Sequence, residues 1–161
     1  VGAFYAFAGV VATRAALTSY FMDTAIAAIG GGRVDPVERR RSVWLIGAAA
    51  VVFAGGAALA AGLDIARWLF LASAAGQAVY IFALAPMYFD LADPPDPRGR
   101  RQTTNAFVIY VAATALVMWA GATGRLMPAA DAPAWLLGLV AAAVVAFGGW
   151  IARHTMTGVY R

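Results

Sequence analysis

The stretch that decides the fold is Ser42–Leu63, SVWLIGAAAVVFAGGAALAAGL, in which no side chain is charged. The hydrocarbon core of a bilayer is about 30 Å thick, and an α-helix needs about 20 apolar residues to cross it. Membrane β-strands are shorter and alternate between apolar and polar residues, which this stretch does not. It therefore predicts a transmembrane α-helix.

Three further uncharged stretches of similar length follow it: Trp68–Phe89, Gln102–Gly124 and Ala132–Ala152. The segment before Gly30 is also largely apolar, but Arg14 and Asp23 interrupt it before Gly30-Gly31-Gly32 ends the pattern. Two interpretations of this segment are open. It is either one tilted, overlong helix, or a first span that ends near Arg14 and continues as a cytoplasmic or interfacial helix.

The composition of the whole chain indicates the same surroundings. Of its 161 residues 63% are hydrophobic and 12% are charged, whereas a soluble domain is about 45–50% apolar and about 25% charged. The mean hydropathy is +0.75. We expect an all-α polytopic membrane bundle, a single domain of five transmembrane helices. They cover approximately residues 1–21 (with a helical extension to 29), 43–63, 68–89, 103–123 and 133–152.

The arginines predict the orientation of these spans. All 12 basic residues are arginine, and the net charge is +4. If five spans alternate in direction, nine arginines fall on one side, and only Arg67 and Arg125 fall on the other. Loops rich in Arg remain in the cytoplasm, so we expect the N-terminus outside and the C-terminus inside. Because this charge acts as a topology signal, it does not indicate a nucleic-acid partner.

Other patterns predict how the helices are placed. The short links after the second and fourth spans predict that spans two and three, and spans four and five, are antiparallel neighbours. The five tryptophans lie near predicted span ends, as in an aromatic belt. Small residues at four-residue steps should face other helices, in this chain or in a partner. These ladders are Ala54, Ala58 and Gly62, and Gly138, Ala142 and Ala146.

Polar groups inside spans are the default candidates for function. Gln77 and Thr114 fall at the same mid-membrane depth on spans that run in opposite directions, so their stripes are expected to face the bundle interior. Asp23 is half a turn away from Arg14, so Arg14 must reach an interface, another helix or an anionic ligand. The alternative is purely structural hydrogen bonding. The candidate ligand-binding residues are Arg14, Gln77, Tyr80, Tyr110 and Thr114.

The loops carry a second set of candidates. Arginines beside the spans can contact anionic lipid headgroups. The carboxylates Asp90, Asp93 and Asp96 are evenly spaced, but prolines and arginines among them favour a solvated loop, and we predict no metal site there. The candidate headgroup contacts are Arg39, Arg40, Arg41, Arg98, Arg100 and Arg101.

The residue content excludes several chemistries. There is no Cys, no Lys and a single histidine, His154, which excludes thiol catalysis, Schiff-base chemistry, haem held by two histidines of this chain and a His-rich metal box. No catalytic motif is present, and no cofactor is indicated.

These exclusions favour a non-catalytic accessory or assembly subunit of a larger membrane complex, bound to another membrane protein or a second copy. The alternative is a small-molecule binding protein or carrier with an intramembrane polar pocket. A lipid-modifying enzyme that uses the Asp90 loop is the least favoured class. Abundant Ala, Gly and Arg without Lys are typical of GC-rich bacterial genomes, so we expect a bacterial inner membrane.

Overall fold

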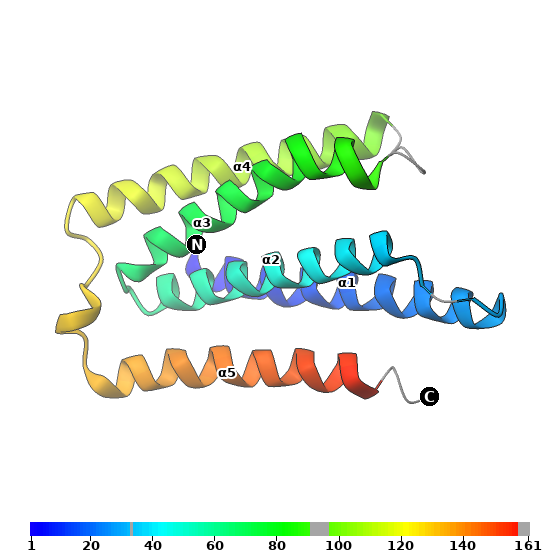
Figure 1. The fold of residues 1–161 in the computed structure, drawn as a ribbon. Coiled ribbons are helices and arrows are strands. Elements are labelled where there is room, and N and C mark those ends of the chain that lie inside the picture. Colours follow the sequence, from blue (N-terminus) through cyan, green and yellow to red (C-terminus); the bar gives the residue numbers. More distant parts are fainter. Residues whose placement is uncertain (33, 91–96, 158–161) are drawn as a thin grey trace.

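The structure is a computed structural model that describes residues 1–32, 34–90 and 97–157. Within these ranges the chain forms an all-α bundle without strands, as expected (Figure 1). Its elements are α1 (Gly2–Ile29), α2 (Pro36–Ala60), α3 (Ile65–Val79), which continues as the π-helix η1 (Tyr80–Phe89), α4 (Pro97–Ala122), the 3₁₀ turn η2 (Ala129–Asp131) and α5 (Ala134–Thr157).

Four of these helices are long and apolar enough to cross a membrane: α2, α3 with η1, α4 and α5. The chain is therefore a multi-pass membrane protein in its architecture. The helix α1 is not among the four, and it carries Arg14 and Asp23. It is nevertheless one continuous helix of 28 residues, so the segment does not break at Arg14.

The start of α2 lies earlier than the uncharged stretch indicates. Asp35 accepts a hydrogen bond from the Val37 N–H at 2.8 Å, and Pro36 occupies the first helical turn. A side-chain cap followed by proline is a strong helix start, because the cap satisfies a free N–H group and proline needs none. As a result Arg39, Arg40 and Arg41 lie on α2 itself rather than in a loop.

The third span changes its helical form at Tyr80. The ten residues of η1 form a π-helix that contains Pro86, and the Asp90 N–H bonds to the Ala85 carbonyl at 2.8 Å. Proline has no N–H and cannot close the α-helical bond to the residue four positions earlier. The uncharged run by itself predicts a uniform span, and Pro86 is the sequence signal that indicates otherwise.

The closest helix contact joins α1 and α2. A Cβ atom on Gly9 would lie 2.6 Å from the backbone nitrogen of Phe53. Gly2 faces the backbone of Ala60 in the same way, and Gly56 faces that of Ala6. Close backbone approach through glycine is a main source of helix association in lipid. The two helices are antiparallel, and Gly2 lies level with the end of α2.

The connections between helices hold one end of the bundle together. Met127 donates to the Gly62 carbonyl at 2.8 Å, and the Asp64 N–H donates to the Met127 carbonyl at 2.9 Å. The Asp64 carboxylate also accepts from the Ala129 N–H at 3.3 Å. From this junction the α3–α4 pair diverges from the α1–α2 pair toward the opposite end (Figure 1). Two hollows, described below, lie between these helices, and we call the region that contains them the cleft.

The junction also explains one wrong prediction. Helices α2 and α3 are antiparallel neighbours as expected, but α4 and α5 are not. The segment that joins α4 to α5 crosses the end of the bundle along Gly62–Asp64. As a result, α5 packs beside α2 and α1 instead of beside α4 (Figure 1). There the Phe147 ring stacks on Phe53 with centroids 4.1 Å apart. The ladder of Gly138, Ala142 and Ala146 faces outward and is exposed.

Candidate functional site

Three aromatic rings from three helices meet at the base of the cleft. Tyr5 of α1 contacts the edges of Phe70 of α3 and Tyr110 of α4, with centroids 5.2 Å and 5.3 Å apart. Phe70 and Tyr110 are stacked at 5.5 Å. All three are at least nine-tenths buried. Edge-to-face and offset arrangements are the favourable ones for aromatic pairs, so this cluster fixes the spacing of the helices that surround the cleft.

Above the cluster lies a cavity of about 510 Å³, which we call the polar cavity. It is enclosed by α1, α2, η1 and α4, together with the end of α3. Three of the candidate residues line it: Gln77 and Tyr80 from the third span, and Tyr110 from α4. Most of the remaining lining is apolar. A largely apolar cavity with a few converging polar groups is the usual form of a small-molecule site.

The polar groups near this cavity mostly bond within their own helix. The Gln77 amide donates to the Ser73 hydroxyl at 3.1 Å. The Thr114 hydroxyl donates to the Tyr110 carbonyl at 2.9 Å, and Thr114 is buried without lining the cavity. The Tyr110 hydroxyl is fully buried, with the Ser73 hydroxyl as its polar neighbour. Because that oxygen is buried, the ring of Tyr110 rather than its hydroxyl lines the cavity.

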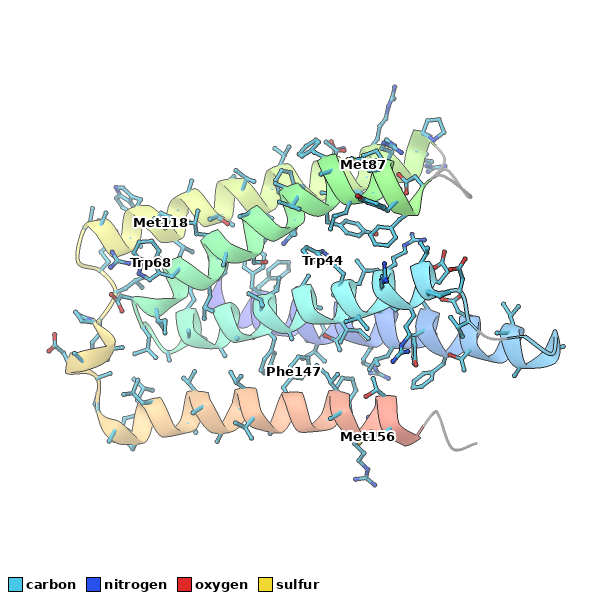
Figure 2. All side chains as sticks on the ribbon, viewed as in Figure 1. Trp44, Trp68, Met87, Met118, Phe147 and Met156 are labelled. Carbon is cyan, nitrogen blue, oxygen red and sulfur yellow. The ribbon has the colours of Figure 1, made fainter. Side chains whose placement is uncertain are left out.

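On the other face of the cleft lies a larger hollow of about 1140 Å³, which we call the α2–α3 groove. Arg39 and Arg40 line it at the start of α2, and Ser73 lines it from α3. Trp44 and Ala48 line both the groove and the polar cavity. Figure 2 shows Trp44 projecting from α2 into the space between the two helix pairs. Trp44 therefore lies between the two hollows.

Arg14 is not in the polar cavity. It is exposed and lines a separate hollow of about 490 Å³ between α1 and α5, with Thr18, Phe21, Trp150 and His154. We call this the Arg14 hollow. The ring of His154 packs against that of Trp150, with centroids 4.7 Å apart, and its Nδ1 lies 2.9 Å from the Trp150 carbonyl oxygen. The structure thus splits the candidate ligand-binding set between two places.

The depth of Arg14 follows from the α1–α2 contact. Gly2 lies level with Ala60, at one end of α2, and Arg14 is 12 residues further along α1, about 18 Å at 1.5 Å per residue. Helix α2 has 25 residues, or about 37 Å. Arg14 therefore lies level with the middle of α2. No ion pair joins it to Asp23 or to any other carboxylate of the described ranges.

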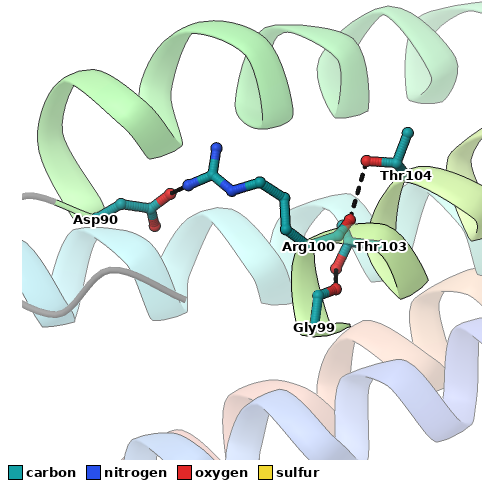
Figure 3. A network of polar contacts seen from close by, with 5 residues as sticks. All are labelled: Asp90, Gly99, Arg100, Thr103 and Thr104. Carbon is teal, nitrogen blue, oxygen red and sulfur yellow. Dashed lines mark hydrogen bonds and ion pairs between the residues drawn. The ribbon is translucent and has the colours of Figure 1, made fainter. Parts of the chain in front are cut away.

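The candidate headgroup arginines differ in their partners. Arg41 lies 3.9 Å from Glu38, and Arg100 pairs with Asp90 at 2.8 Å. Figure 3 shows the second pair, which links η1 to α4, beside hydrogen bonds within the first turns of α4. Asp93 and Asp96 lie outside the described residues. Arg98 and Arg101 are exposed on α4, and Arg39 and Arg40 line the groove.

Sequence reasoning missed two residues of these sites. Tyr5 lies in an apolar segment that gave no reason to select it, although Gly2 and Gly9 on either side of it are a sign of close helix packing. Trp44 is noted in the sequence only as a tryptophan near a span end, and nothing in the sequence indicates that it lines two hollows. No protein family, curated protein or solved structure shows detectable similarity to this chain.

Proposed function

We propose that this chain is a non-catalytic accessory or assembly subunit of a larger membrane complex, in the inner membrane of a bacterium. Arg14 carries the proposal. A charged side chain in the middle of a bilayer is unfavourable by about 2.5–3.5 kcal/mol on insertion scales, and such residues nearly always pair inside a bundle. Arg14 lies level with the middle of α2 and has no carboxylate partner in the part of the chain that is described.

The surroundings of Arg14 favour a protein partner. The hollow opens between α1 and α5, and no residue of α5 with a described side chain is buried. The ladder of Gly138, Ala142 and Ala146 offers a further face on which a helix backbone can approach closely. A transmembrane segment that carries an Asp or Glu at mid-depth would supply the charge that Arg14 lacks.

The test is purification of the tagged chain in native lipid, followed by mass spectrometry. We expect a membrane protein, or a second copy, to accompany the wild type and to be lost with Arg14→Gln. Arg98→Gln removes the same charge from an exposed site and serves as the matched control. Recovery of the wild type alone, or retention of the partner by Arg14→Gln, would contradict the proposal.

The absence of cysteine permits a second test. Thr18→Cys places a single thiol at the Arg14 hollow, and Ala112→Cys places one on the exposed face of α4. A cross-linker with a maleimide at one end and a photoreactive benzophenone at the other should join the first variant to the partner. Equal cross-linking from Ala112→Cys would mean that contacts are unspecific.

The proposed topology is five spans with the N-terminus outside and the C-terminus inside. Of the arginines in the described ranges, seven lie on the ends of α2, α4 and α5 away from the junction, and Arg67 and Arg125 lie at the junction end. In intact cells, an impermeant maleimide should label Ala130→Cys and leave Gly32→Cys unlabelled. Labelling of both, or the reverse pattern, would overturn this orientation.

A second candidate function is that of a small-molecule binding protein or carrier. The polar cavity favours it, because Gln77 and Tyr80 bring polar groups to a largely apolar lining. These groups suit a largely apolar, uncharged ligand with one hydrogen-bonding group. Native mass spectrometry of the chain extracted from its host should show such a ligand in the wild type and its loss in Gln77→Leu. A ligand-free wild type would exclude this function.

A further inference from the structure

The α2–α3 groove has a form that differs from the other hollows. Its α2 wall is one helical stripe, Pro36, Arg40, Val43 with Trp44, Gly47 and Val51, at steps of three and four residues. Residues at such steps lie above one another on a helix. The α3 wall consists of Ala72, Ser73 and Gly76. The groove is therefore long, with apolar and small side chains along most of its length.

The floor of the groove is open because of two glycines. A Cβ atom built on Gly47 or Gly76 would have no neighbouring atom within 4 Å. Nothing in the described parts of the chain fills the space beside them. A volume of about 1140 Å³ exceeds the about 300–1,000 Å³ of ordinary small-molecule pockets.

Charge is concentrated at one end of the groove. Arg39 and Arg40 line its mouth, and neither forms an ion pair or a side-chain hydrogen bond with a described residue. The nearby Arg41, in contrast, lies beside Glu38. Two adjacent guanidinium groups without acidic partners are suited to phosphate, which they bind through paired hydrogen bonds.

The depth of these features matches that of a lipid. Helix α2 has 25 residues, about 37 Å, which exceeds the hydrocarbon thickness of about 30 Å by four to five residues. With the junction end of α2 at one boundary, Arg39 and Arg40 reach the headgroup level at the other. From Arg40 the stripe continues for 11 residues to Val51, about 16 Å into the hydrocarbon.

From this arrangement we infer that the α2–α3 groove binds an anionic phospholipid. Its phosphate lies on Arg39 and Arg40, and one acyl chain extends past Trp44 along Gly47 and Gly76. This site is independent of the proposed subunit function, because it lies on a different face from the Arg14 hollow.

Trp44 reports on the site because it lines the groove. The protein is prepared in mild detergent with Trp44 as its single tryptophan, the other four being replaced by Phe, and is titrated with lipids that carry brominated acyl chains. Phosphatidylglycerol should quench Trp44 at about tenfold lower mole fraction than phosphatidylcholine, since each arginine near a lipid surface favours anionic lipid. Equal quenching by the two lipids would overturn the inference.

Matched variants distinguish lipid binding in the groove from a general attraction of anionic lipid to the arginines of the chain. Arg39→Gln with Arg40→Gln should abolish the preference, and Arg125→Gln, which removes an exposed charge at the junction end, should retain it. Gly47→Leu fills the groove and should remove quenching by phosphatidylglycerol, whereas Gly148→Leu, which also has open space around it, should not. A preference that survives Arg39→Gln with Arg40→Gln, or that inorganic phosphate in excess abolishes, would contradict a lipid site.

Discussion

The α1–α2 pair and α5 contain the same kinds of small residue but place them on opposite faces. Gly2 and Gly9 of α1 and Gly56 of α2 lie between the two helices, so that the backbones touch. In α5 the small residues Gly138, Ala142 and Ala146 face outward, and larger ones such as Phe147 face α2. The α1–α2 contact thus joins backbone to backbone, whereas the α2–α5 contact joins side chains such as Phe147 (Figure 2).

The spacing of the small residues accounts for this difference. Gly2, Gly9 and Ala16 recur every seven residues on α1, and all three are buried. Ser42, Ala49 and Gly56 recur at the same interval on α2 and are also buried. A seven-residue repeat keeps one seam in contact along a helix pair. A small residue thus marks a contact face only where a partner helix carries a matching repeat.

The largest loss of stability is expected for Gly56→Leu, which tests the backbone contact between α1 and α2. The new side chain would overlap the backbone of Ala6, and backbone cannot move aside as a side-chain tip can. We expect a loss of about 3 kcal/mol or more in stability, at or above the usual range for overpacking. Thermal unfolding in mild detergent, followed by circular dichroism, measures it. An unfolding midpoint equal to that of the wild type would show that α1 and α2 do not pack as described.

A smaller effect is expected for Phe147→Ala. It removes the ring that stacks on Phe53, and a half-buried ring should be worth about 1–2 kcal/mol, less than the about 3–5 kcal/mol of a buried one. Only α5 should loosen. In single-cysteine pairs that join α2 to α5, disulfide formation should fall, while pairs that join α1 to α2 remain unchanged. A fall in both kinds of pair would mean that α5 supports the whole bundle.

The smallest effect is expected for Gly138→Leu. No atom lies within 4 Å of the added Cβ, and leucine favours a helix by up to about 1 kcal/mol over glycine. The stability of the purified chain should remain equal or rise slightly. A loss comparable to that of Gly56→Leu would mean that this face of α5 is packed within the chain.

The sequence was sufficient for the helices but not for all of their neighbours. The length of an uncharged run follows from bilayer thickness, and α2, α3–η1, α4 and α5 lie where these runs predict them. The neighbours of α5 depend on where a connection is fixed by hydrogen bonds. The hydrogen bonds between Gly62, Asp64 and Met127 join backbone groups. Every residue has these groups, so the pattern of side chains does not predict such bonds.

The candidate site divides in the same way. Helix periodicity and depth brought Gln77, Tyr80 and Tyr110 together correctly as a geometric group, because both quantities follow from residue spacing alone. Arg14 could not be placed, since the side of α1 that faces α5 depends on the route of residues 123–133. The α2–α3 groove could not be predicted, because it depends on open space beside Gly47 and Gly76 that the sequence does not indicate.

The junction at Asp64 has a mechanical consequence for the two hollows of the cleft. The hydrogen bonds that join the connections lie at one end of the bundle, so each helix pair behaves as a lever about 37 Å long that is fixed at that pivot. A tilt of about 5° there displaces the far ends by about 3 Å. The width of the cleft at the level of Arg40 and Tyr80 therefore depends on bonds located a full membrane thickness away, as well as on the aromatic cluster at the base of the cleft.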